Sequence, residues 1–128
     1  MKREELDTTI LVVSTVDYAH LGLATLLSAK RHSSDRCLYS IFLADGGSES
    51  ARITKDYARS VGLDIKVVTP SDLCSTYRDK YLACFDYYNG FEVSNVAKYV
   101  GILHCLDNEC TRVVYADSDL CFYSDIVG

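Results

Sequence analysis

The first seventy residues alternate between strand-like and helix-like patterns, and this alternation restricts the fold more than any other feature of the chain. Short apolar, β-branched runs predict strands over residues 8–16, 37–45 and 63–70. Helical spacing and capping residues predict helices over residues 17–31 and 48–61, the second ending at Gly62. Strands that alternate with helices form a parallel sheet through right-handed crossovers. The sequence therefore predicts a Rossmann-like, three-layer α/β/α fold with a mostly parallel sheet.

The second half of the chain is less regular. Residues 70–90 are rich in tyrosine and fit either a short helix or an ordered loop, whereas residues 111–117 predict a fourth strand. No internal repeat, low-complexity tract or linker interrupts the 128 residues, which predicts a single domain over residues 1–128. From Glu92 onward the helical period returns, and the apolar side of this helix is predicted to comprise Val93, Val96, Ala97, Val100 and Leu103.

The acidic charge balance argues against a nucleic-acid-binding domain. The formal net charge is −5 and the sequence pI is about 5.0, whereas such domains present a basic surface to phosphates. No apolar run is long enough to span a bilayer. The opening "MKREELD" lacks the apolar core of a signal peptide, so the sequence predicts a cytoplasmic protein.

The six cysteines show no CxxC spacing of the kind found in zinc or redox sites. Several lie in apolar stretches, where a reduced cysteine packs as a small hydrophobic residue. Reduced structural cysteines in a cytosolic protein are therefore the favoured interpretation, and a disulfide framework is the alternative.

Polar residues follow three of the four predicted strands at their carboxyl ends. Thr15 and Asp17 follow the first strand, Asp45 the second, and the segment from Asp117 to Asp119 the fourth. Open α/β sheets bind ligands at this edge, near the point where the strand order reverses. Mg²⁺ and Mn²⁺ prefer oxygen ligands and often share them with a phosphate, so the aspartates predict a divalent metal site. The alternative for "DSD" is an ordinary turn, since Asp and Ser are common turn residues.

A standard nucleotide-binding loop is missing from the sequence. Neither GxGxxG nor the P-loop patterns GxxxxGKS and GxxxxGKT occurs. Backbone groups of Thr15 and Val16 can instead meet a nucleotide base, with Tyr18 packed beside it. The alternative is that Asp17 only caps the helix that follows, and the two roles are compatible.

Three stretches together resemble one enzyme family. "AKYVGILHCLDNECTRVVYADSDLCFYSDI" has the family's helix with a basic residue, its strand ending in YxDxD and its hydrophobic run closing in "DI". "ILVVSTVDYAHLGLATLLSAKRHS" and "YSIFLADGG" are similar to its first strand and helix and its second strand and turn. The chain thus resembles the GT-A fold glycosyltransferases, most closely the retaining family 8. The resemblance implies a nucleotide-sugar donor, usually a UDP-sugar, and Mn²⁺ or Mg²⁺ as cofactor.

The resemblance also implies a role for individual residues. Asp117 and Asp119 would ligate the metal, and Lys98 would face the diphosphate or sugar of the donor. A solvated charge on a helix is the alternative for Lys98. The residues expected to bind the donor nucleotide are Thr15, Val16, Asp17, Tyr18, Asp45, Lys98, Asp117 and Ser118.

The resemblance covers the donor-binding half of such an enzyme. Family members continue with an acceptor half that adds a metal ligand, commonly histidine, and no histidine follows "DSD" here. His20 and His104 are expected to be ordinary helix residues. We therefore expect a truncated glycosyltransferase domain with an unknown acceptor and a sheet edge open to self-association. The alternatives are a nucleotide-sugar-binding module without turnover and a receiver-like phosphoryl-transfer domain.

Overall fold

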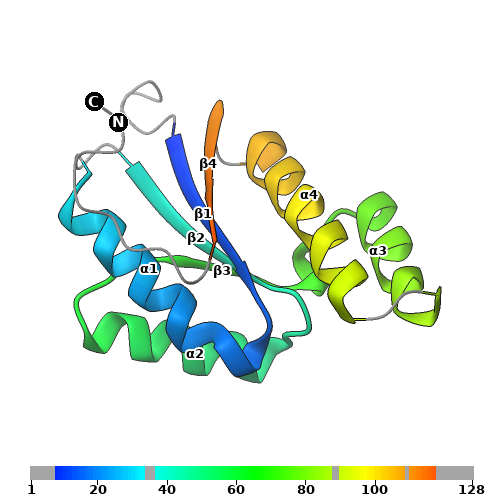
Figure 1. Cartoon of the computed structure of the whole chain (residues 1–128), viewed down its shortest axis with the longest axis horizontal. Helices are drawn as coiled ribbons and strands as arrows, with labels where there is room; N and C mark the ends of the chain where they lie inside the picture. The colour runs from blue at the N-terminus through cyan, green and yellow to red at the C-terminus, as the bar shows by residue number, and fades with distance from the viewer. Residues whose placement is uncertain (1–7, 34–36, 88–89, 109, 118–128) are drawn as a thin grey trace.

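Four parallel strands form the centre of the molecule in the order β3-β2-β1-β4 (Figure 1). The computed structural model describes residues 8–33, 37–87, 90–108 and 110–117. The predicted mostly parallel α/β architecture is confirmed. The strands are β1 (Thr8–Ser14), β2 (Cys37–Leu43), β3 (Lys66–Val68) and β4 (Arg112–Ala116).

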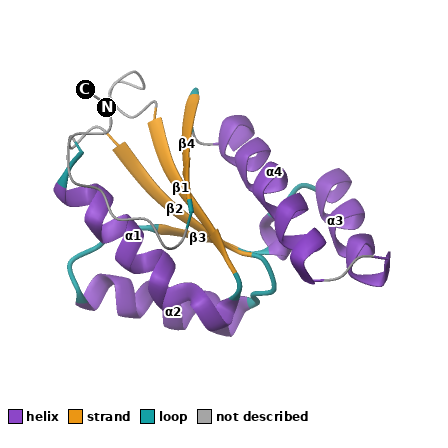
Figure 2. Cartoon of the chain, viewed as in Figure 1, coloured by secondary structure: helices purple, strands orange, loops and turns teal. Residues whose placement is uncertain are grey.

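Helices cover both faces of the sheet, with α1 and α2 on one face and α3 and α4 on the other (Figure 2). Two short 3-10 helices, η2 and η3, follow β1 and β3. The helical elements are η2 (Val16–Tyr18), α1 (Ala19–Arg31), α2 (Ser48–Ser60), η3 (Pro70–Asp72), α3 (Ser75–Tyr87) and α4 (Gly90–Asn108). The predicted three layers are therefore present.

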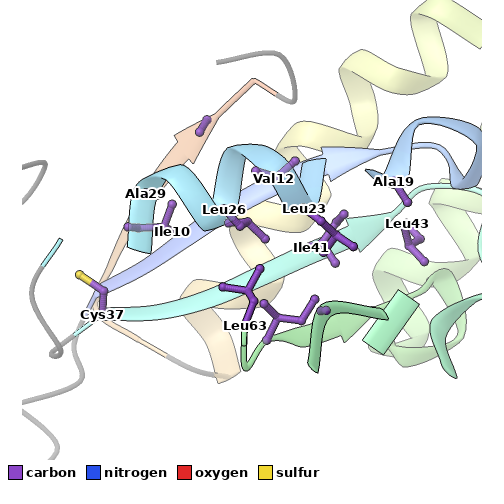
Figure 3. Packing of buried hydrophobic residues seen from close by; sticks show 13 residues of the cluster. Ile10, Val12, Ala19, Leu23, Leu26, Ala29, Cys37, Ile41, Leu43 and Leu63 are labelled. Carbon is purple, nitrogen blue, oxygen red and sulfur yellow. The ribbon is translucent and has the colours of Figure 1, made fainter. Parts of the chain in front are cut away.

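Alternation along β1 divides the core into two clusters. Ile10 and Val12 point toward α1 and α2, whereas Leu11 and Val13 point toward α4. Figure 3 shows the first cluster, in which Leu23 and Leu26 of α1 pack onto the sheet. β1 is apolar on both faces because it lies in the middle of a sheet covered on both sides.

Two glycines allow a helix to approach each face of the sheet closely. A Cβ at Gly22 of α1 would lie 3.0 Å from the side chains of Ile41 and Val12. A Cβ at Gly101 of α4 would lie 3.3 Å from Leu11 on the opposite face. Both distances are tighter than ordinary packing contacts, so the two helices lie nearer to the sheet than a larger residue would permit.

Gly22→Val is expected to lower the free energy of unfolding by about 1–3 kcal/mol, because the added side chain would overpack the α1–sheet contact. Urea denaturation followed by circular dichroism measures the change. Ala24→Val is the control, since it places a valine at an exposed position of α1, where only helix propensity is lost. Gly22→Val improves helix propensity, so a loss of stability no larger than that of Ala24→Val would contradict the close-packing argument.

Several predicted boundaries differ from the structure. β3 has only three residues, because its pairing with β2 is confined to Ser40–Phe42, and β1 and β2 each end two residues early. The tyrosine-rich segment forms the 13-residue helix α3, a helix longer than expected. Gly62 does end α2, with a φ of +82° that favours glycine.

The predicted apolar side of α4 is partly wrong. Ala97 is buried and Val96 and Val100 are half-buried, as predicted, but Leu103 is 41% exposed. The helix instead buries His104 and Cys105. It packs against both β1 and α3, so its buried surface turns away from the side that apolar spacing alone selects. Val93 belongs to the residues whose side chains are not described.

The strand order reverses between β1 and β4. From β1 the chain moves outward to β2 and then β3, and it returns across the other face through α3 and α4 to place β4 beside β1. In open α/β sheets the crevice at such a reversal, at the carboxyl ends of the strands, is where ligands bind. The residues that follow β1 and β4 are therefore the first to consider as a site.

Candidate donor-binding site

The turn after β1 is tied to the turn after β2. The backbone N–H of Val16 donates a hydrogen bond of 2.8 Å to the Asp45 carboxylate. The N–H of Tyr18 donates to the carbonyl of Thr15, which closes η2. The structure thus brings together four predicted donor-binding residues at one edge of the sheet, namely Thr15, Val16, Tyr18 and Asp45.

The prediction that Asp17 caps α1 is wrong. β1 ends at Ser14, and η2 is inserted before the helix, so Asp17 lies inside that short turn. Tyr18 takes the N-cap position of α1 and makes no side-chain capping bond. The Asp17 carboxylate is exposed at the carboxyl edge of the sheet, where its proposed role beside a nucleoside stays a prediction.

The backbone around Asp45 is held from two sides. The N–H of Ala44 donates to the carbonyl of Ser14 at 2.8 Å, which extends the β1–β2 pairing past the strand ends. The turn then needs a glycine at Gly46, because a Cβ there would lie 2.7 Å from the Cβ of Leu43. The position of the Asp45 carboxylate is therefore set by the sheet and by a turn that excludes a side chain.

Tyr81 of α3 supports the same turn, a role that no sequence pattern indicated. Its hydroxyl donates a buried hydrogen bond of 2.8 Å to the carbonyl of Ala44. Its ring packs against Phe42 of β2, with ring centroids 5.7 Å apart. Burial, and then the nearby charge of Asp45, raise the pKa of Tyr81 well above its usual range. The hydroxyl therefore remains a hydrogen-bond donor at neutral pH.

Asp117 follows β4 on the opposite side of the strand-order reversal. Ala116 pairs with Val12 of β1, so Asp117 comes directly after the last paired residue of β4. Its carboxylate is exposed and lies two residues after Tyr115 of β4. Burial, followed by the charge of Asp117, raises the pKa of Tyr115 to about 12, so this hydroxyl is protonated at neutral pH.

Lys98 of α4 reaches the same group of side chains. Its ammonium nitrogen lies 5.6 Å from the centre of the Tyr115 ring, a cation–π contact. Lys98 is half-buried, and its role at the donor stays a prediction beside the alternative of a solvated helix charge. The ring that it covers belongs to β4, two residues before the predicted metal ligand Asp117.

The metal site is described only in part. Ser118 and Asp119 lie outside the described residues, and within the described ones no three His, Cys, Asp or Glu side chains form a group suited to a metal. Asp117 fits as one hard oxygen ligand for Mg²⁺ or Mn²⁺, because its carboxylate is exposed at the end of β4. The metal and its second protein ligand stay predictions.

Two histidines lie on helices that flank the sheet. His20 is exposed on α1, and His104 is buried on α4, where the Asn108 side-chain amide lies 3.4 Å from its Nδ1 atom. Both are helix residues, as predicted.

Two pockets lie at different ends of the sheet. One of about 290 Å³ opens between α1 and α2 and includes Val16, next to the candidate site, and Tyr57. A larger one of about 760 Å³ lies at the amino ends of β2 and β3, near Lys30 and Lys66. Pocket size alone would therefore place the site at the amino edge of the sheet, away from the aspartates. We place the candidate site at the carboxyl edge, because the strand order reverses there and the predicted ligands gather there.

No known family model matches the sequence, and no curated protein matches it. Among solved structures, the mouse xyloside xylosyltransferase 1 in its apo form has a similar fold, with a TM-score of 0.57 and 13% sequence identity. The similarity covers 94% of this chain and 46% of that chain, so this chain spans about half the length of the similar structure. The likeness confirms a glycosyltransferase-type (GT-A) α/β fold and does not identify family 8.

Two further predictions concern the cysteines and the absence of a membrane-spanning segment. The five described cysteines are not paired with one another, and their reduced state stays a prediction. Across residues 8–117, leaving out the short undescribed segments, the helices are too short or too polar to cross a bilayer.

Proposed function

We propose that the chain is the donor-binding half of a metal-dependent glycosyltransferase and that its donor is a UDP-sugar. The observation that carries this proposal is the arrangement at the strand-order reversal. The turn after β1 is held by Asp45 on one side, and Asp117 follows β4 on the other. A nucleoside at the β1 turn and a diphosphate at Asp117 would occupy one continuous edge of the sheet.

The nucleoside would lie against the turn formed by Thr15, Val16 and Asp17. Tyr18 has 59% of its surface exposed there, which leaves an aromatic ring able to pack against a base. Asp45 holds this turn through the Val16 N–H, so its proposed role is to shape the nucleoside pocket.

The diphosphate would lie near Asp117, Ser118 and Asp119. Two carboxylates make a weak metal site alone, and diphosphate oxygens would complete the ligand shell. A bound Mn²⁺ or Mg²⁺ would neutralise charge on the diphosphate as the glycosidic bond breaks. Lys98 would add a second positive charge from α4, on the side where it now covers Tyr115.

The finer assignments rest on the sequence resemblance. These are membership of family 8 and retention of configuration at the transferred sugar. The proposed cytoplasmic location rests instead on the cysteine usage. β3 and β4 are the outer strands of the described sheet, and either edge can support self-association.

A binding module without turnover is the second candidate. The tie between the Val16 N–H and the Asp45 carboxylate shapes a binding turn and supplies no catalytic group, so the same site can hold a nucleotide without transferring a sugar. UDP-sugar hydrolysis in the presence of Mn²⁺ separates the two candidates. Release of free sugar supports the enzyme, and saturable binding without release supports the module.

UDP is expected to bind at least about tenfold more tightly with Mn²⁺ than without it, a difference of about 1.4 kcal/mol, because the metal joins the carboxylates to the diphosphate. Isothermal titration calorimetry of the wild-type chain, with Mn²⁺ or with EDTA, measures both affinities. Uridine is the control ligand, since it lacks the diphosphate and should ignore the metal. Equal UDP affinity in both buffers, or no UDP binding at all, contradicts the proposal.

A further inference from the structure

A cleft of about 290 Å³ lies between α1 and α2, next to the turn that follows β1. It is lined by residues of η2 and of both helices, and the proposed function assigns no ligand to it. Val16 connects the two regions, because its N–H donates to Asp45 at the candidate donor site and the residue also lines the cleft. The cleft is therefore a separate hollow whose purpose the donor site does not explain.

The cleft has a buried floor and an exposed rim. Ala19 of α1 and Thr54 of α2 belong to the floor, and both are more than nine-tenths buried. Their small side chains do not fill the space between the helices. The rim includes Ile53 and Tyr57, about one turn apart on α2 and each more than half exposed. Exposed apolar side chains that gather beside a hollow are typical of ligand-binding grooves.

The lining of the cleft favours an uncharged ligand. Among the described residues, none that lines it is Asp, Glu, Lys or Arg. The Ser50 hydroxyl is already used by the turn before α2, where it accepts a bond of 2.8 Å from the Gly47 N–H and donates one of 3.1 Å to the Gly47 carbonyl. The larger pocket at the amino edge differs, because three lysines and an aspartate line it. A charged ligand would lose hydration in the cleft and find no opposite charge there.

The size of the cleft and the rings at its rim favour an aromatic ligand. An apolar cavity of about 150 Å³ binds one benzene molecule, so a cleft of about 290 Å³ has room for two fused rings. Tyr57 of α2 and the exposed His20 of α1 each bring a ring to the lining, and aromatic rings attract one another beyond the effect of burial. We infer that this cleft binds an uncharged aromatic compound of one or two rings, at a site separate from the proposed donor site.

Indole, an uncharged compound of two fused rings, is expected to bind the wild-type chain with a dissociation constant of about 1 mM or lower. Proton–nitrogen correlation NMR spectra measure the affinity, and the amide signals of Ala19, His20 and Thr54 should shift. Indole carboxylate has the same rings and a negative charge, so it should bind at least about tenfold more weakly. Shifts confined to other parts of the chain, or no saturable change below about 10 mM indole, would overturn the inference.

Ile53→Asp is expected to weaken indole binding at least about tenfold, because it adds a carboxylate to the rim of an apolar site. Leu82→Asp is the matched control, since it makes the same kind of change at an exposed position of α3 and should keep the wild-type affinity. Circular dichroism checks that both variants fold, and the amide shifts of the wild-type chain locate the ligand without any variant. Equal affinities in the two folded variants would contradict the proposed location.

UDP distinguishes the cleft from the proposed donor site. The affinity for indole should be the same with and without saturating UDP, because the two ligands occupy different places. If UDP displaces indole, the cleft belongs to the donor site and the inference of a separate ligand is wrong. If the wild-type chain binds indole at the cleft but does not bind UDP, the proposed function fails and the second site stands.

Discussion

Phe42→Ala is expected to lower the free energy of unfolding by about 3–5 kcal/mol, the largest loss of stability among the changes considered for this chain. Phe42 is fully buried in β2, and its ring packs against Tyr81. Gly101 of α4 approaches the same ring, so a Cβ there would lie 3.3 Å from it. The neighbouring residues are held by a strand and two helices, so they cannot collapse fully into the cavity that the ring leaves. The free-energy cost of this cavity adds to the cost of the lost hydrophobic burial.

The measurement is urea denaturation, with the midpoint and slope compared between variant and wild type. Tyr99→Ala is the control, since it removes a ring that is 70% exposed on α4 and should change stability by less than about 1 kcal/mol. Because Tyr81 also donates to Ala44, Phe42→Ala should loosen the turn that carries Asp45. A loss of stability similar to that of the control would mean that the α3–α4 side of the sheet is not a packed core.

The first half of the fold follows from local patterns. β1 and β2 are continuous apolar runs, and α1 has the spacing that buries Ala19, Leu23 and Leu26. These signals are independent of the rest of the chain, because a strand covered on both faces must be apolar throughout. The patterns also predicted that ligand-binding residues would follow β1, β2 and β4.

The structure of the second half depends on packing between its elements, which local sequence patterns do not reveal. α3 has little apolar periodicity, and it packs on α4 through residues such as Tyr77 and Tyr81. α4 lies between the sheet and α3, so its buried residues include His104 and Cys105 as well as the predicted Ala97. Tyrosine-rich sequence is compatible with a helix or a loop, and the packing of α3 on α4 decides between them.

The candidate site, like the fold, could be predicted only in part from local sequence patterns. The sequence patterns placed Asp45 and Asp117 at strand ends, but the hydrogen bond from Val16 to Asp45 and the contact of Lys98 with the Tyr115 ring depend on how the elements pack. Tyr81 escaped prediction because it acts through Ala44 and Phe42, which lie far from it in the sequence. Because the strand order places β4 beside β1, the residues that follow these strands lie along one edge of the sheet.

The double variant Asp117→Ala/Asp119→Ala is expected to abolish the effect of Mn²⁺ on UDP binding, a loss of about tenfold or more in affinity. With both carboxylates removed, the metal has no protein ligand at the end of β4 and can no longer join the protein to the diphosphate. UDP affinity in EDTA should stay near the wild-type value or rise slightly, because two negative charges near the diphosphate are gone. Calorimetric titration in both buffers gives the four affinities.

The control is Asp56→Ala/Asp64→Ala, which removes the same charge from α2 and from the approach to β3, away from the candidate site. This variant should keep the full response to Mn²⁺, since Asp56 only pairs with exposed Arg52 at 3.7 Å. Equal loss in both variants would indicate a general charge effect, because screening of an acidic chain does not depend on which carboxylates are removed. A double variant at Asp117 and Asp119 that retains the wild-type response to Mn²⁺ would show that "DSD" is a turn and that the metal, if it acts, binds elsewhere.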